Sequence, residues 1–170
     1  MTLHTGVGYS KNFKEAFCSI SESERHDAAS VVAHLIPIIE RYLELFPLTT
    51  NLHLLSDGPT TQYRNKTYFY LLTKLIRERF PQLLSITHNF GEAGHGKWGP
   101  DGVGGALKNI ADDVVAHGTD VSNFESFKTG LEKDVKTVHL AVIKDESIKN
   151  VDKVVPKGIL PPGEPCRFIS

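Results

Sequence analysis

The residues in this sequence with the clearest chemical potential are two aspartates that stand beside glycines. Asp57 ends the apolar run 51–56 and opens a turn, so the pattern places its carboxylate at the end of a buried strand. Asp101 lies in the glycine-rich segment 91–105, at the entry to a later helix. Carboxylates from different elements form the cages that hold Mg²⁺ or Mn²⁺ in phosphodiester chemistry, and adjacent glycines let a phosphate approach. Asp57 and Asp101 are therefore the candidate catalytic acids and metal ligands; the simpler alternative for each is a turn or helix-cap residue.

The glycine-rich segment carries two more candidates. His95 can orient a phosphate or assist proton transfer. Residues 91–97 also fit GxxxxGK, the start of a phosphate-binding P-loop that ends at Lys97. Trp98 stands where such a loop needs Ser or Thr, and the Gly-Pro pair after it prevents the helix that the loop requires. A P-loop NTPase is therefore a weaker alternative.

Polar and cationic side chains follow Asp57 closely. We expect them on the first turn of a helix, where they make phosphate and base contacts, although a solvated helix face is an equally good interpretation. The candidate nucleic-acid contacts are Gln62, Arg64, Asn65, Lys66, Lys97 and Lys108.

Periodicity predicts the elements that position these residues. Alternation over 3–9 and 16–21 predicts a β-hairpin, and Asp27 caps a helix to residue 46 that Pro37 kinks or divides. Further strands are expected at 51–56, 83–90 and 138–143, and helices around 68–76, 103–115 and 124–135. The strand at 51–56 is typical of a sheet centre. The order is close to that of a ribonuclease H-like domain, an α/β fold with a mixed sheet flanked by helices, without its first central strand.

Composition narrows the class of protein. The chain has 170 residues, which predicts one domain over residues 1–148 and an irregular tail over 149–170. The net charge of −1 gives no global basic field, so any nucleic-acid contact must be a local patch. Two distant cysteines favour a reducing compartment, and we find no signal peptide and no apolar run long enough for a membrane span.

Several segments together resemble a group of transposon-derived proteins of animal genomes. The resemblance rests on residues 55–66, 88–90, 94–97, 101–105 with Lys108, and on the upstream segments 3–7 and 23–27. It covers residues 2 to about 145. These proteins resemble DDE-type transposases with a ribonuclease H-like core, which implies metal-dependent DNA cleavage and strand transfer. Asp57 would carry over as the second catalytic acid and Asp101 as the third, with Mg²⁺ or Mn²⁺ as cofactor and DNA as partner.

The chain departs from that pattern because the family's first aspartate lies upstream of the segment that matches residues 3–5. We therefore expect an N-terminally truncated, inactive core, and leave catalysis by this chain open. The alternative is a domesticated nucleic-acid- or protein-binding module without cleavage. The absent strand would leave open sheet edges that another segment or a homodimer covers. The resemblance implies a nuclear or cytoplasmic location.

Overall fold

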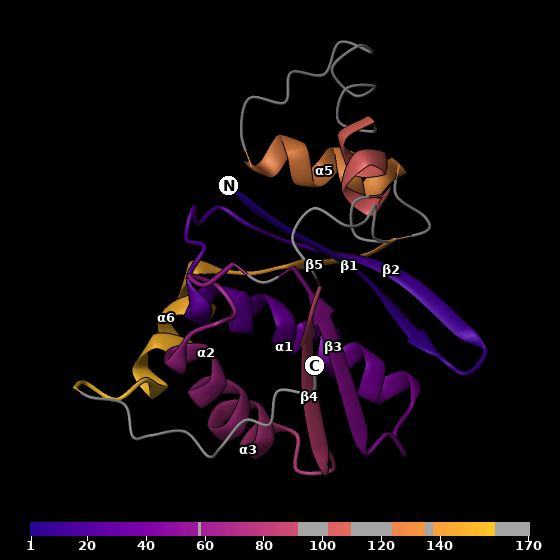
Figure 1. Cartoon of the computed structure of the whole chain (residues 1–170). Helices are drawn as coiled ribbons and strands as arrows, with labels where there is room; N and C mark the ends of the chain where they lie inside the picture. Colours follow the sequence, from indigo (N-terminus) through magenta and orange to yellow (C-terminus); the bar gives the residue numbers. More distant parts are fainter. Residues whose placement is uncertain (58, 92–101, 110–123, 135–137, 159–170) are drawn as a thin grey trace. The chain divides into compact units, whose positions relative to one another are not determined.

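The computed structural model describes residues 1–57, 59–91, 102–109, 124–134 and 138–158, and has a mixed α/β architecture in which helices flank the strands (Figure 1). The chain divides into two compact units. The first unit comprises residues 1–24 and 96–145, and the second comprises residues 25–95 and 146–170. The predicted domain 1–148 thus contributes to both units. No helix in the described ranges has the length and apolarity needed to cross a membrane.

The first unit contains a three-stranded mixed sheet in the order β1-β2-β5. Strand β1 (Thr2–Ser10) pairs antiparallel with β2 (Phe13–Ser21), which confirms the predicted hairpin. Strand β5 (Val138–Val142) pairs parallel with β2. Alternation directs every second side chain of β2 to one face, so Cys18 and Ile20 lie on the same side.

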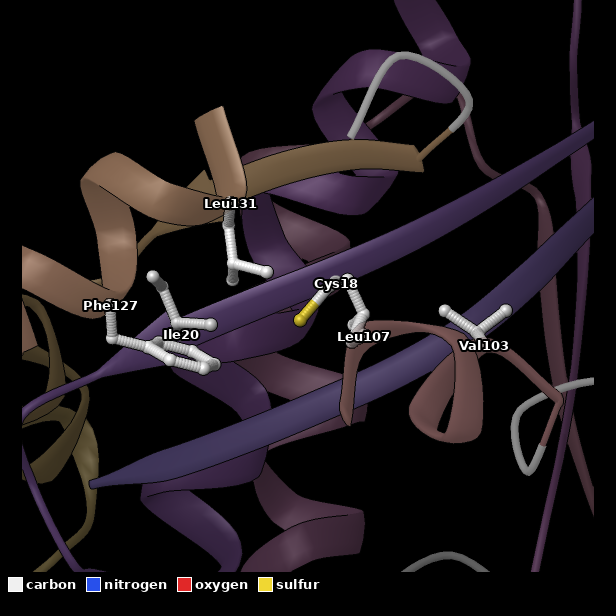
Figure 2. Packing of buried hydrophobic residues seen from close by; sticks show 6 residues of the cluster. All are labelled: Cys18, Ile20, Val103, Leu107, Phe127 and Leu131. Carbon is white, nitrogen blue, oxygen red and sulfur yellow. The ribbon is translucent and has the colours of Figure 1, made fainter. Parts of the chain in front are cut away.

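Two helical segments cover that face of the sheet. They are residues 102–109, which overlap the helix predicted at 103–115, and helix α5 (Phe124–Asp134), which lies within the helix predicted at 124–135. Figure 2 shows their side chains around β2; the buried set is Cys18, Ile20, Val103, Leu107, Phe127 and Leu131. Burial raises the pKa of the Cys18 thiol to about 12, so this cysteine is a packing residue.

The Phe17 side chain of β2 lies close against the backbone of Gly6 in β1. Gly6 is paired with Phe17, and a Cβ atom added to Gly6 would lie 2.1 Å from Cζ of that ring. The Phe17 ring therefore lies across the glycine backbone and occupies the space that any larger residue would need.

The second unit begins with helix α1 (Ala28–Leu45). The Asp27 carboxylate accepts a hydrogen bond from the Ser30 amide at 3.0 Å, as predicted for a helix cap. The helix continues through Pro37, so the alternative in which Pro37 ends its first part is wrong. Phe46 follows the last turn, and its amide donates to the Tyr42 carbonyl.

Two parallel strands form a separate sheet in this unit. Strand β3 (Asn51–Ser56) pairs with β4 (Ser85–Phe90), and a helical run connects them. The run consists of α2 (Lys66–Leu71), a π-helical turn (Leu72–Ile76) and α3 (Arg77–Arg79). Its apolar face is buried, as the spacing predicted, through Tyr68, Leu71, Leu72 and Ile76.

Strand β3 is less enclosed than its composition suggests. Asn51, His53 and Leu55 are exposed, and Leu55 retains 54% of its accessible surface. The expectation of a strand buried on both faces is therefore wrong, because one face carries polar and exposed residues. In the described part of the chain, four strands have only one paired edge: β1, β3, β4 and β5. Pairing of a second copy at these edges stays a prediction.

Helix α6 (Asp145–Val154) crosses the predicted boundary between the domain, residues 1–148, and the irregular tail, residues 149–170. Residues 149–154 are helical, with Ile148 and Val151 buried. Asp152 of this helix forms a two-point ion pair with Arg25, which also contacts the cap residue Asp27. The Arg25 guanidinium lowers the pKa of the Asp152 carboxyl. These contacts tie α6 to the beginning of α1.

Candidate functional site

The candidate site lies where β3 and β4 end. The strands are parallel and pair Ser56 with Phe90, so their carboxyl ends lie side by side. Asp57 follows β3 directly, in the predicted position. The Gly91 amide donates to the Ser56 carbonyl at 2.8 Å, which extends the ladder by one hydrogen bond. The glycine-rich segment therefore begins beside the backbone that presents Asp57.

The Asp57 side chain is exposed to solvent. Among the described residues, no hydrogen bond or ion pair occupies its carboxylate, which is thus open to a cation or a polar ligand. Tyr63 lies close enough to respond to this charge. Burial, and secondarily the negative charge of Asp57, raises the pKa of the Tyr63 hydroxyl well above its usual range.

The loop after Asp57 is a turn that precedes the helix. Pro59 accepts hydrogen bonds from the amides of Gln62 and Tyr63, and helix α2 begins only at Lys66. The prediction that Gln62, Arg64 and Asn65 occupy the first helical turn is therefore wrong. The turn forms because proline fixes its backbone and offers a carbonyl to the following amides.

Asn65 has a structural role in this loop. Its side-chain oxygen accepts from the Tyr68 amide at 2.9 Å, which caps α2. Its amide nitrogen donates to the carbonyls of Thr60 and Thr61 at 2.9 and 3.1 Å. The Asn65 amide thus closes the loop on itself, which leaves Arg64 and Lys66 as the exposed cations beside it.

Arg64 is held at the end of β4. Its guanidinium carbon lies 4.9 Å from the centroid of the Phe90 ring, within range of a cation–π contact. Phe90 is paired with Ser56, the residue before Asp57. The contact therefore orients a solvent-exposed cation at the strand end that carries the candidate acid.

Beneath this surface lies an aromatic cluster centred on His88. The imidazole stacks on Phe90 with ring centroids 4.4 Å apart, and it meets Tyr63 and Tyr68 edge to face at 5.3 Å each. Burial lowers the pKa of His88 to about 4, so the ring is neutral near pH 7. The sequence shows His88 on a strand but not its partners, because these depend on the register of β3 against β4.

Hydrogen bonds connect both nitrogens of this imidazole. Nδ1 lies 2.9 Å from the Tyr68 hydroxyl, and Nε2 lies 2.9 Å from Oγ of Ser56. The Ser56 hydroxyl donates in turn to the carbonyl oxygen of Asp57. The roles of Ser56 and Tyr68 were not predicted from the sequence: Ser56 is on strand β3 and Tyr68 is on helix α2, and only the tertiary structure brings them to His88.

Four of the predicted site residues lie outside the described part of the second unit. His95, Lys97 and Asp101 lie outside the described residues, as does nearly all of the P-loop-like segment. Lys108 is exposed on the helical segment 102–109 of the first unit. Within the described ranges, no group of three or more His, Cys, Asp or Glu side chains is arranged to hold a metal ion. The shared site of Asp57 and Asp101 therefore stays a prediction.

Comparison with known proteins identifies a family and no activity. No curated protein and no solved structure gives a significant match to the chain. One family model, described as a domain of unknown function (DUF8701), matches residues 1–159. That match spans both compact units and the whole of the candidate site. The chain is therefore a member of the DUF8701 family.

Proposed function

We propose that this chain is a DDE-type transposase-derived core with a ribonuclease H-like fold, and that it binds a divalent cation and DNA at the carboxyl ends of β3 and β4. The observation that carries the proposal is the exposed Asp57 carboxylate at the end of a parallel strand, beside the start of the segment that contains Asp101. Ligand sites of parallel sheets form outside the carboxyl ends of the strands.

The donor chemistry of this site suits Mg²⁺ or Mn²⁺. Both ions prefer carboxylate oxygens, and Asp57 offers an exposed carboxylate that no described side chain neutralises. Asp57 and Asp101 would hold the ion together. When bound, such an ion stabilises negative charge on a phosphodiester. The element order β-β-α-β-α-β also supports the proposal, since the hairpin, α1 and the parallel pair follow one another as expected.

The cationic side of the site supports DNA as the ligand. The Arg64 guanidinium is oriented by Phe90, and Lys66 begins α2 on the same loop. Phosphate oxygens accept hydrogen bonds from such side chains without regard to sequence. Arg64 and Lys66 therefore position a nucleic-acid backbone next to Asp57 in this proposal.

A Mn²⁺ titration followed by electron paramagnetic resonance tests the metal site. Asp57→Asn and Asp101→Asn should each weaken binding at least tenfold, since each removes a ligand of one ion. Glu44→Gln is the matched control, because it removes an exposed carboxylate of α1 and should leave binding unchanged. Equal affinity in Asp57→Asn and the parent protein would refute the shared site.

The second candidate function is nucleic-acid binding without cleavage. The contact between Arg64 and Phe90 favours it, because binding needs only the oriented cation and not the metal. Arg64→Gln should reduce the slope of log K against log salt by about 1, whereas Arg77→Gln, an exposed arginine of α3, should not. DNA binding that survives Asp57→Asn without any Mg²⁺-dependent cleavage by the parent chain would favour this function over catalysis.

A further inference from the structure

The hydrogen bonds around His88 have only one consistent direction. The Ser56 hydroxyl has a single hydrogen, and it donates this hydrogen to the Asp57 carbonyl. Toward His88 the same oxygen can therefore only accept, at 2.9 Å. The Nε2 atom of His88 must carry the hydrogen of that bond.

The tautomer of His88 follows from this direction. A neutral imidazole has one N–H group, so Nδ1 is unprotonated when Nε2 is the donor. Nδ1 then accepts from the Tyr68 hydroxyl, which lies 2.9 Å away. Tyr68 is fully buried, and its hydroxyl would otherwise be a donor without water. The result is a chain of three bonds that runs from Tyr68 through His88 and Ser56 to the backbone of Asp57.

We propose that His88, held as the Nε2–H tautomer by Tyr68, is the positioning residue of Asp57. This inference rests on the proposed function of Asp57 as a ligand for a divalent cation. Its mechanical basis is the packing of the imidazole between Phe90 and two tyrosines, which fixes the ring plane and hence the position of Nε2. A fixed Nε2 fixes Ser56, and Ser56 fixes the peptide that carries the Asp57 carboxylate.

The bond chain would act by preorganisation. A ligand carboxylate loses less freedom on metal binding when its backbone is already held, and partners behind a ligand change metal affinity by about 10- to 100-fold. The imidazole does not serve as a metal ligand, because Nε2 is hydrogen-bonded to Ser56 and Nδ1 to Tyr68. His88 is therefore distinct from a histidine ligand.

The first experiment measures the tautomer in the metal-free protein. Two-dimensional long-range ¹H–¹⁵N spectra connect the carbon-bound protons of the imidazole ring to its two nitrogens, and the nitrogen shifts distinguish the protonated nitrogen from the bare one. The signals that disappear in His88→Gln belong to His88. We expect Nε2 protonated and Nδ1 bare near pH 7. The opposite tautomer, or rapid exchange between the two, would overturn the proposal whether or not the protein binds metal.

The second experiment measures Mn²⁺ affinity in folded variants. Ser56→Ala cuts the chain of bonds by removing a single oxygen atom and should weaken Mn²⁺ binding about tenfold. His88→Gln keeps an amide donor near the position of Nε2 and should retain affinity within about twofold, whereas His88→Leu should lose it as Ser56→Ala does. His53→Gln, on the exposed face of β3, is the control and should change nothing.

The two failures are distinguishable. If the parent chain binds no Mn²⁺, the proposed function of Asp57 falls, and with it the positioning role, while the tautomer is still measured. If the parent binds Mn²⁺ and Ser56→Ala binds equally well, the metal site stands and the positioning role is refuted. Circular dichroism at the titration temperature verifies that each variant is folded, and Ser56→Ala keeps the test decisive if His88→Leu unfolds.

Discussion

The buried imidazole of His88 predicts that this protein loses stability as the pH falls from about 6.5 to about 4. Burial among Tyr63, Tyr68 and Phe90 lowers the pKa of His88 from 6.5 to about 4 in the folded state. Between these values the unfolded chain binds a proton that the folded chain does not, so acid favours unfolding. Above pH 6.5 and below pH 4 the contribution of His88 should not change with pH.

The magnitude follows from the two pKa values. The full difference corresponds to about 3 kcal/mol of unfolding free energy, and partial solvent access to the ring reduces the expectation to about 2 kcal/mol. Protonation would also place a second N–H against the Tyr68 hydroxyl, where the neutral ring has an acceptor. The unfolding free energy should fall most steeply midway between pH 6.5 and pH 4, where the unfolded and folded chains differ most in the protons they bind.

Urea denaturation followed by circular dichroism at pH 7, 6, 5 and 4.5 measures the effect. The difference between the parent protein and His88→Gln cancels the carboxylates that titrate in both proteins. This difference should shrink by about 2 kcal/mol from pH 7 to pH 4.5. His53→Gln removes an exposed imidazole outside the His88 cluster and is the control for the loss of a histidine. A parent and a His88→Gln variant with the same pH dependence would refute the reasoning.

Three further predictions concern packing and ion pairing. Gly6→Ala should destabilise the hairpin by about 1–3 kcal/mol in chemical denaturation, because the new Cβ would lie 2.1 Å from the Phe17 ring; unchanged stability would show that the ring moves freely. Asp152→Asn should cost about 1 kcal/mol, and less at high salt, since the ion pair with Arg25 is partly exposed; a cost that persists in 1 M NaCl would contradict this. Leu131→Ala should cost about 2–5 kcal/mol in the same assay, because Leu131 is 1% exposed in the core of Figure 2, and a cost below 1 kcal/mol would indicate a loosely packed core.

The elements with regular patterns could be predicted from the sequence. The alternation over residues 3–9 identified β1, and Asp27 marked the start of α1, because a strand period and a cap residue are local signals. Helix α5 was also predicted nearly to its ends.

The exposure of β3 and the extent of α6 could not be predicted in the same way. Leu54 and Leu55 are adjacent and equally apolar, so composition cannot tell which of them faces the interior. In α6, the buried pair Ile148 and Val151 has helical spacing. The prolines that follow favour an irregular segment, and this signal led to the prediction of an irregular tail from residue 149. The α6 contact with Arg25 links residues far apart in sequence, which no local pattern reveals.

The candidate site was predicted in part. Asp57 lies at the strand end that its position after an apolar run indicated. The hydrogen bonds among Tyr68, His88 and Ser56 depend on the pairing of β3 with β4, so no local sequence pattern predicts them. Asn65 was predicted to contact nucleic acid because asparagine side chains often bind phosphates and bases. In the structure its side-chain amide instead caps α2 and bonds the preceding loop.

Paramagnetic broadening by Mn²⁺ in a ¹H–¹⁵N spectrum tests the central claim most directly. At a small fraction of one equivalent, the amide signals of Ser56, Asp57 and Gly91 should weaken together with those around Asp101, and Asp57→Asn should abolish the effect at all of them. Broadening scattered over the exposed acidic residues, or confined to only one of the two aspartates, would contradict a shared metal site.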